Sequence, residues 1–427
     1  MTAVPRSRLT PPESSPFGLH NLPYGSFGLP GQSARVGVAV GEQVLDLTAA
    51  SSRLAPDLAD LFAQGDLDRL LAAGPQTWQD VRTTVRGWFD DPDAQPVVEA
   101  LLRPTADVQM MMPFTVADYV DFYASEHHAT NIGRMFRPGS DPLTPNWKHL
   151  PIGYHGRAGT IVASGTPVIR PCGQRRTPDG EVVFGPSDRL DIEAELGFVV
   201  GAPSTLGVPV PLAAFTDHVF GVCLVNDWSA RDLQAWEYVP LGPFLGKSFA
   251  TSISPWVVPL AALHDARTAP PAREPALLPY LDDHAGEPWG LDVRLEVRLN
   301  GHLIARPPFR SMYWTAAQML AHMTVNGASL RTGDLFASGT VSGPEPDERG
   351  SLMELSWGGQ EPLALPDGSS RSFLEDGDEV VITATAPRPD GTRIGFGDVR
   401  GTIRPARPAG HPGTTTPTDA DHRRDQP

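Results

Sequence analysis

Strand-length apolar runs, separated by glycine and proline turns, fill the chain from about residue 106 to residue 406. Representative runs are GTIVASGTPVIR, LDIEAELGFVVG, HVFGVCLVND, SPWVVPL, LDVRLEVRLNGHLI and DEVVITATA. The 42 glycines and 45 prolines among 427 residues leave few stretches that could form a long helix. We therefore expect a large domain that is mainly β, with short helices around His127–Met135, around Ser229–Trp236 and in TAAQMLAHMTVN.

The chain before this region has a different pattern. Residues 33–47, SARVGVAVGEQVLDL, predict two short strands around a Gly-Glu turn. The segments PDLADLFAQG, DLDRLLAAG, TWQDVRTTVRGWF and VVEALLR place apolar residues three to four apart, which favours helices. We expect an N-terminal extension over 1–15, a small domain of strands and helices over 16–105, and a large, mainly β domain over 106–406. Residues 407–427 contain no Leu, Ile, Val or aromatic residue and predict a disordered tail.

Charge and apolar patterning exclude two classes of partner. The formal net charge is −16 and the sequence has no compensating basic patch, so we expect neither nucleic acid nor an anionic membrane surface as a partner. No apolar stretch approaches the length of a membrane span, and the N-terminus has no secretory pattern, so we expect a cytoplasmic protein. The two cysteines, Cys172 and Cys223, do not favour a disulfide, and Cys223 lies in a run that predicts burial.

The segment LDIEAELGF, residues 190–198, brings three acids together. Its apolar residues alternate with Asp191, Glu193 and Glu195, which is the period of a strand with one apolar face. The three carboxylates then project from the opposite face, where like charges repel. Either water screens them on a solvated strand face, or a positive group lies among them.

Further polar residues follow the run GVCLVND. Its apolar residues deliver Asn226 and Asp227 to the end of a strand, where a side chain leaves the core. A helix ARDLQAWE is expected next, with Ser229 as its N-cap. Arg231 and Gln234 are three apart and would share a face of that helix, which could equally be a capped surface helix.

Two histidines occur in DYVDFYASEHHATN. Asp121 and His128 are seven apart, so they would align on a continuous helix. If instead a strand ends near Ala124 and Ser125 caps a new helix, His128 falls in the first turn. Either geometry could bring Asp121 and His128 to face inward. A lone histidine is usually structural, and His127 serves as an internal control that we expect outside any site.

The segment SLMELSW, residues 351–357, is interpreted as an apolar strand. A glutamate inside it, Glu354, must face solvent or have a partner. A histidine whose orientation it fixes is the natural partner.

No single spacing above is specific, but longer segments resemble one family. The segments NLPYGSF, DFYASEHHATNIG, PNWKHLPIGYHGR, LDIEAELGF, VNDWSARDLQAWEYVPLGPFLGKSFATSISPW and DLFASGTVSGPEP resemble the fumarylacetoacetase (fumarylacetoacetate hydrolase) family over residues 16–406. The resemblance implies a small N-terminal SH3-like β-barrel with helices and a large C-terminal β-sandwich roll. It also implies a homodimer, a small-molecule substrate, and metal-dependent cleavage of a carbon–carbon bond in 4-fumarylacetoacetate to fumarate and acetoacetate, the last step of tyrosine and phenylalanine catabolism.

The resemblance also implies a metal site. Its ligands would be the carboxylates of Asp121, Glu193, Glu195 and Asp227. Four carboxylates in one pocket would protonate or move apart unless a cation held them, and ligation by oxygen alone favours Ca²⁺ or Mg²⁺ over zinc. Asp191 matches no ligand of the family, so we expect it to be structural.

The family's catalytic groups fall on five residues of this sequence. His128 would activate the attacking water and Glu354 would orient it, while Arg231, Gln234 and Lys247 would stabilise the oxyanion. The implied substrate contacts are Tyr123, Arg137, Tyr154, Gln234, Tyr238 and Thr340, with Arg137 pairing with a substrate carboxylate.

One position departs from the family pattern. In GKSFATS, Ala250 stands where the family usually has glycine, in a loop implied to form a second, magnesium site with Lys247 and Thr251. A methyl group there would alter the allowed backbone angles if φ were positive.

Two other functions are compatible with the acids. Another metal enzyme of the same superfamily, such as a 2-keto acid decarboxylase, an acylpyruvate hydrolase or a hydratase, would share them but generally lacks the N-terminal domain. A non-catalytic, calcium-stabilised β protein would need the acids but would have no use for His128.

Overall fold

The computed structural model describes residues 9, 11, 12, 14–284 and 286–407. The expected tail over 407–427 lies, apart from Arg407, outside the described residues, and so does most of the expected N-terminal extension. The predicted class, mainly β with some helices, is confirmed. None of the described helices is long and apolar enough to cross a membrane.

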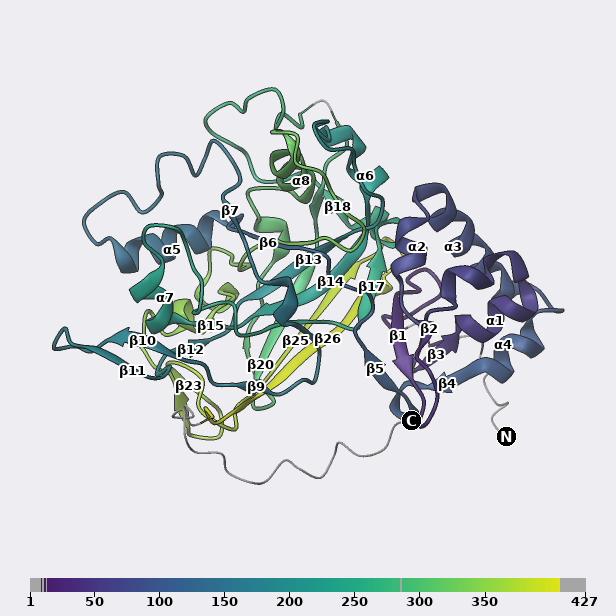
Figure 1. Cartoon of the computed structure of the whole chain (residues 1–427), viewed down its shortest axis with the longest axis horizontal. Coiled ribbons are helices and arrows are strands. Elements are labelled where there is room, and N and C mark those ends of the chain that lie inside the picture. The colour runs from purple at the N-terminus through teal and green to yellow at the C-terminus, as the bar shows by residue number, and fades with distance from the viewer. Residues whose placement is uncertain (1–8, 10, 13, 285, 408–427) are drawn as a thin grey trace, which may run out of the picture.

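The N-terminal strands and helices lie together at one end of the molecule (Figure 1). The strands are β1 (Tyr24–Gly28), β2 (Arg35–Val40), β3 (Gln43–Asp46), β4 (Leu102–Pro104) and β5 (Gln109–Met111). The helices are α1 (Leu47–Leu54), α2 (Asp68–Ala72), α3 (Pro75–Asp90) and α4 (Gln95–Leu101). The predicted strand pair over 33–47 is confirmed as β2 and β3, which meet at a turn where Gly41 has φ 62°.

The remainder of the chain forms the strands and short helices of the larger region. Its strands are β6 (Tyr119–Phe122), β7 (Gly153–His155), β8 (Ile161–Ala163), β9 (Val168–Ile169), β10 (Cys172–Arg176), β11 (Val182–Pro186), β12 (Leu190–Asp191), β13 (Ala194–Val200), β14 (Val219–Asp227), β15 (Ser229–Ala230), β16 (Thr251–Ile253), β17 (Trp256–Pro259), β18 (Arg267–Thr268), β19 (Gly290–Leu291), β20 (Arg294–Leu299), β21 (His302–Ala305), β22 (Leu335–Ala337), β23 (Leu363–Ala364), β24 (Ser370–Arg371), β25 (Glu379–Pro387) and β26 (Arg393–Arg404). Its helices are α5 (Glu126–Phe136), α6 (Phe215–His218), α7 (Arg231–Glu237), α8 (Ala316–Thr324) and α9 (Leu352–Leu355).

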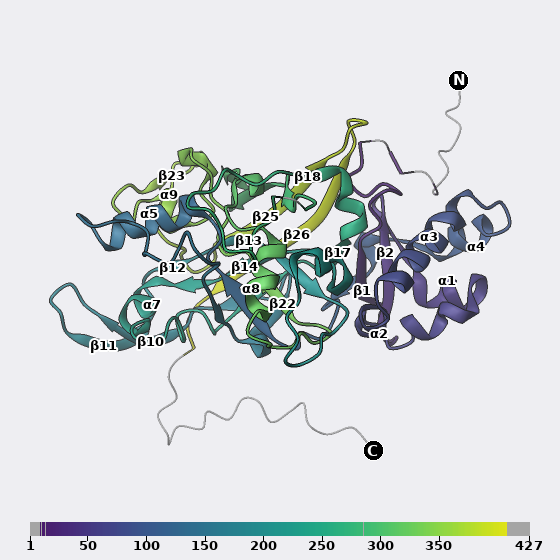
Figure 2. The same cartoon turned by 90° about the horizontal axis from the view of Figure 1, so that it is seen from above.

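Two sheets form the body of the molecule. The larger has the order β4-β3-β2-β1-β17-β14-β13-β22-β6-β7, and the smaller has the order β21-β20-β25-β26-β9. Strands β25 and β26 contact β14, so the sheets pack face to face over a core that includes Phe198, Leu224, Ile382 and Val399. Figure 2 shows the same arrangement from above, with α5, α7 and α9 at the end away from α1–α4.

The N-terminal strands continue the larger sheet, because β1 pairs with β17. A second core, shared by the N-terminal helices and the opposite face of this sheet, includes Trp78, Val85, Phe220, Cys223 and Val257. Strands β13 and β14 are therefore covered on both faces, which explains their nearly continuous apolar sequences. The SH3-like closure of the N-terminal strands and the domain boundaries stay predictions.

Two local predictions were wrong. Residues 352–355 form the helix α9 rather than a strand, because the Ser351 hydroxyl caps its first turn by accepting a hydrogen bond from the Glu354 amide. Helix α7 begins at Arg231 and has no side-chain cap, while Ser229 belongs to β15. The expected burial of Cys223 is confirmed, and both cysteines are free.

Candidate metal centre and His–Glu pair

Strand pairing brings three of the four acids to one face of the larger sheet. Gly197 of β13 pairs with Ala337 of β22, which in turn pairs with Asp121 of β6. Glu195 lies two residues before Gly197 and so shares its face. Glu195 also pairs with Val225 of β14, two residues before Asp227. Asp121 and Glu195 are 74 positions apart in the sequence, and they meet because β22 lies between β6 and β13 and pairs with both at neighbouring register.

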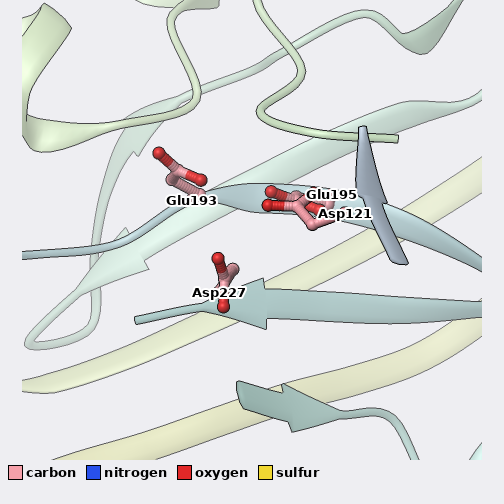
Figure 3. A group of neighbouring side chains, drawn as sticks. All are labelled: Asp121, Glu193, Glu195 and Asp227. Carbon is pink, nitrogen blue, oxygen red and sulfur yellow. The ribbon is translucent and has the colours of Figure 1, made fainter. Parts of the chain in front are cut away.

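Glu193 completes the group from the two residues that separate β12 from β13. The four carboxylates each offer an oxygen, and these oxygens lie within 4.8 Å of one another. All four side chains are buried, with Glu195 fully enclosed, so the alternative of a solvated strand face is wrong. Figure 3 shows Asp121 and Glu195 side by side, Asp227 at the end of β14, and Glu193 just before β13.

Several of these oxygens have no hydrogen-bond partner among the described residues: Oδ1 of Asp121 and both Oε atoms of Glu195. Burial, followed by repulsion from the neighbouring carboxylates, raises the pKa of Glu195 well above its ordinary value. Burial and the proximity of Asp227 likewise raise the pKa of Asp121. Unpartnered, mutually repelling carboxylates are what a bound cation would satisfy.

Two buried cationic side chains, Lys247 and Arg231, lie beside the four carboxylates. The ammonium of Lys247 lies 2.6 Å from Oε2 of Glu193 and 2.6 Å from Oδ2 of Asp227. Burial alone would raise the pKa of Glu193, but Lys247 and then Arg231 outweigh it and lower that pKa. Arg231 is also paired with Asp191. Five carboxylates therefore share two positive charges, and an all-oxygen donor set with excess negative charge fits a hard divalent cation.

His128 is placed by the cap that the sequence predicted. The Ser125 hydroxyl accepts a hydrogen bond from the His128 amide at 3.2 Å, and α5 starts at Glu126. The Nδ1 atom of His128 lies 2.7 Å from Oε2 of Glu354, and both side chains are buried. The predicted pairing is thus present, although α9 rather than a strand carries the glutamate. His127 is only half-buried and takes no part in this pair.

Three further donors hold the Glu354 carboxylate. They are Asn131 Nδ2 at 2.9 Å, Ser342 Oγ at 3.0 Å and Ser351 Oγ at 2.8 Å. Burial would raise the pKa of Glu354, but the His128 imidazole and the hydrogen bonds from Asn131 and Ser351 outweigh burial and lower it. The sequence analysis missed all three donors. The signal for Asn131 was its position three residues after His128, on the same helix face.

Arg231 and Gln234 are joined directly, with Nη1 of Arg231 3.2 Å from Oε1 of Gln234. The Nε atom of Arg231 donates to Asp191 at 2.8 Å. Its Nη2 atom lies 2.7 Å from Oε1 of Glu193, but the N–H is not aligned with that oxygen and makes no hydrogen bond. The fully buried Asp191 is thus a partner of Arg231 and not a member of the four-carboxylate group.

A cavity of about 120 Å³ opens beside the acids on the Lys247 side. Its lining includes Asp227, Lys247, Thr251 and Tyr154, whose hydroxyl lies 3.4 Å from Oδ2 of Asp227. Thr251 donates to Oδ1 of Asp227 at 2.6 Å. The cavity is also lined by Tyr119, which the sequence analysis missed although it lies two residues before an acid in β6 and so shares its face.

The remaining expected substrate contacts divide into two groups. The Tyr123 ring packs edge-on against the His128 imidazole, with ring centres 5.3 Å apart, and the buried Thr340 hydroxyl has no hydrogen-bond partner among the described residues. Arg137 and Tyr238 are exposed, and Arg137 Nη2 donates to the Pro142 carbonyl at 2.6 Å. Among the described residues, no hydrogen bond or ion pair joins Arg137 or Tyr238 to an acid of the cluster.

Ala250 is accommodated without strain. The described non-glycine residues with positive φ are Leu22, Asn300 and Trp357, so Ala250 does not occupy the backbone region that would have required glycine. Its methyl group packs in the core between the sheets.

The fold and the site together define a class: a two-sheet β protein with a buried carboxylate cluster beside a His–Glu pair. The family model described as fumarylacetoacetate (FAA) hydrolase C-terminal matches residues 118–404, and the one described as fumarylacetoacetase N-terminal matches residues 20–113. The chain belongs to the fumarylacetoacetase family.

Curated relatives and one solved structure agree with this assignment. Fumarylacetoacetase from Homo sapiens is 46% identical over 411 residues, covering 92% of this chain and 97% of the relative. The enzyme from Caenorhabditis elegans is 46% identical over 420 residues, covering 94% and 99%. A fumarylacetoacetate hydrolase from the psychrophilic Exiguobacterium antarcticum is 19% identical with a TM-score of 0.52, covering 90% of this chain and all of that chain, which supports the fold alone.

Proposed function

We propose that this protein hydrolyses a carbon–carbon bond of 4-fumarylacetoacetate to give fumarate and acetoacetate, the last step of tyrosine and phenylalanine catabolism. The observation that carries the proposal is the pairing of His128 with Glu354 in the same buried region as four acids, in a chain that matches fumarylacetoacetases over nearly its whole length. A calcium-stabilised structural module would need the acids but not the pair.

His128 acts as the general base in this proposal. A carboxylate only accepts hydrogen bonds, so the contact between Nδ1 and Glu354 places the proton on Nδ1. The neutral imidazole then presents Nε2 as an acceptor, and no described residue hydrogen-bonds that atom. Nε2 is therefore free to take a proton from the attacking water and to return it to the departing acetoacetate carbon.

Asp121, Glu193, Glu195 and Asp227 would hold a Ca²⁺ or Mg²⁺ ion. Such an ion, when bound, stabilises the enolate charge that makes a β-diketone fragment an acceptable leaving group. The proposed second ion, with Lys247 and Thr251, is harder to support, because both side chains already donate to Asp227. We therefore assign them to holding Asp227 in place.

Arg231, Gln234 and Lys247 are the proposed oxyanion donors. An ammonium has three N–H groups, and the two carboxylates that Lys247 contacts use two of them. The unaligned Nη2 of Arg231 and the amide of Gln234 provide further N–H groups close by. Fixed donors of this kind lower the barrier to the tetrahedral intermediate because they need no reorganisation.

The substrate would contact Tyr123, Tyr154, Thr340 and Gln234 around the acids. Arg137 and Tyr238, which we propose from the family pattern, follow the last residues of α5 and α7. These are the helices that carry His128 and Arg231, so the ends of the helices would have to close over the substrate for Arg137 to pair with its carboxylate.

We also propose a cytoplasmic homodimer. Exposed apolar side chains gather in the segment after α7: Tyr238, Val239, Leu241, Phe244 and Leu245. A contiguous exposed apolar segment of this kind favours association with a second copy. The two free cysteines agree with a reducing compartment.

Turnover assays with matched variants test the proposal. Loss of the fumarylacetoacetate chromophore is measured for the wild type, with acylpyruvates as competing substrates. His128→Ala should reduce kcat at least about 100-fold with cation affinity and Tm nearly unchanged, whereas His127→Ala should behave as wild type. Turnover of acylpyruvates but not of fumarylacetoacetate would overturn the substrate, and an unaltered rate in His128→Ala would overturn the base.

A further inference from the structure

Asp191 is the one acid of LDIEAELGF that lies outside the four-carboxylate group, yet it is fully buried. Its carboxylate accepts four hydrogen bonds. Oδ1 lies 2.7 Å from the Ile192 amide and 2.8 Å from the Leu352 amide, and Oδ2 lies 2.8 Å from Nε of Arg231 and 3.1 Å from the Met353 amide. One side chain therefore contacts the start of α9 and the start of α7 at once.

The two contacts lead to different parts of the proposed machinery. Leu352 and Met353 are the first two residues of α9, and Ser351 bonds the amide of the third, Glu354. Asp191 thus supplies the acceptors for the first two amides of the helix that carries Glu354, which holds the His128 imidazole at 2.7 Å. A four-residue helix has little stability of its own, so its position depends on such outside contacts.

The other contact sets the direction of Arg231. The Nε–H bond to Asp191 fixes the plane of the guanidinium, and Nη1 and Nη2 then face Gln234 and Glu193. Without Asp191, the guanidinium would be free to turn and pair fully with Glu193. Displacements of about 1 Å in catalytic groups lower rates by about 100-fold. A residue that holds both Arg231 and the helix bearing Glu354 should therefore affect the rate of the reaction.

We propose that Asp191 is a positioning residue for the reaction: it holds Arg231 and the helix bearing Glu354 in a fixed relation, so that the oxyanion donor and the oriented base face the same substrate. The kinetic part of this inference rests on the proposed function. The structural part, that Asp191 keeps the His128–Glu354 hydrogen bond in place, does not.

The test variant is Asp191→Asn, because an amide replaces one acceptor oxygen by a donor that would face Arg231 or a backbone N–H. The matched control is Asp378→Asn. Asp378 is also buried and accepts from Arg371, Asn300 and a backbone amide, yet it shares no hydrogen-bond partner with Asp191. Should Asp191→Asn not fold, Asp191→Glu keeps the charge and the acceptors but displaces them by one methylene group.

The first measurement needs no substrate. The imidazole N–H shared by His128 and Glu354 should give a downfield proton NMR signal that is absent from His128→Ala. We expect this signal to shift or broaden in Asp191→Asn or Asp191→Glu and to stay in place in Asp378→Asn. An unmoved signal in a folded Asp191 variant overturns the inference, whether or not the proposed substrate is turned over.

The second measurement is kcat at saturating substrate and cation, at a temperature well below every Tm. We expect Asp191→Asn to lower kcat at least about 10-fold with a smaller change in KM, and to cost much less in a Glu354→Gln background, because the two residues act as one unit. Full activity of folded Asp191→Asn under these saturating conditions, or equal losses in both backgrounds, would overturn positioning through Glu354. If the wild type did not turn over fumarylacetoacetate, the proposed function would be wrong.

Discussion

Replacing Glu195 by glutamine should stabilise the cation-free protein and remove the stabilisation that a divalent cation gives. Both Oε atoms of this fully buried side chain lack a hydrogen-bond partner among the described residues, and the neighbouring acid oxygens lie within 4.8 Å. Two carboxylates at that separation repel by about 3.5 kcal/mol at an effective dielectric near 20. A glutamine amide has no charge and can donate to the neighbouring acids.

The net change in the stability of Glu195→Gln should be smaller than the repulsion energy of one carboxylate pair, because Lys247 already offsets part of the negative charge of the cluster. We expect Glu195→Gln to raise the free energy of unfolding in EDTA by about 1–3 kcal/mol, which corresponds to an increase in Tm of about 1–3 °C for a chain of this size. The wild type should gain about 2.7 kcal/mol when the cation is present at 100 times its dissociation constant, whereas the variant should gain little.

Thermal unfolding with EDTA, with Ca²⁺ and with Mg²⁺ measures both effects. Glu99→Gln removes an exposed glutamate of α4, among the N-terminal helices, and should follow the wild type under all three conditions. A lower Tm for Glu195→Gln in EDTA would show that the carboxylate is not under repulsion. An undiminished shift with cation would show that the ion binds elsewhere.

Three further outcomes follow from local geometry. Ser125→Ala removes the N-cap of α5 and should lower stability by about 1 kcal/mol in urea unfolding, with a larger effect on kcat than on KM. A methyl group on Gly133 would lie 1.9 Å from the Pro142 carbonyl oxygen, so Gly133→Ala should cost about 1–3 kcal/mol, whereas Gly87→Ala, with open space around its Cβ, should be neutral or stabilising. Glu354→Gln should cost about 3 kcal/mol near neutral pH. Because the pKa of Glu354 is lowered in the folded state, this difference should persist above about pH 4.3 and shrink as the pH falls below it, as thermal unfolding of both proteins from pH 3 to 8 would show.

The sequence predicted the strands of the site better than its short helix. The alternation in LDIEAELGF and the end of GVCLVND place Glu195 and Asp227 correctly because β13 and β14 are buried strands whose register follows the apolar pattern. SLMELSW has a similar apolar alternation, yet it forms α9. Its conformation is decided by the Ser351 cap and by Asp191, a side chain more than 150 positions away, and neither leaves a periodic signal.

The burial of the acids could not be predicted either. A strand with alternating carboxylates usually faces water, and in this chain the second face is covered because the N-terminal helices and β1 pack onto the same sheet. That covering depends on contacts between segments about 100 or more residues apart. The family resemblance suggested a cation among the acids, but only the structure shows carboxylate oxygens left without partners.

These features link the proposed chemistry to the packing of both ends of the chain on β13 and β14. The core between the two sheets and the core under the N-terminal helices exclude water from opposite faces of β13 and β14. Carboxylates at the ends of these strands cannot be screened by solvent, so their charge must be met by Lys247, Arg231 and a bound cation. The same exclusion strengthens every charge that faces the substrate. Deletion of the N-terminal strands and helices should therefore lower both the affinity for the cation and kcat. None of the proposed catalytic residues belongs to the first hundred positions.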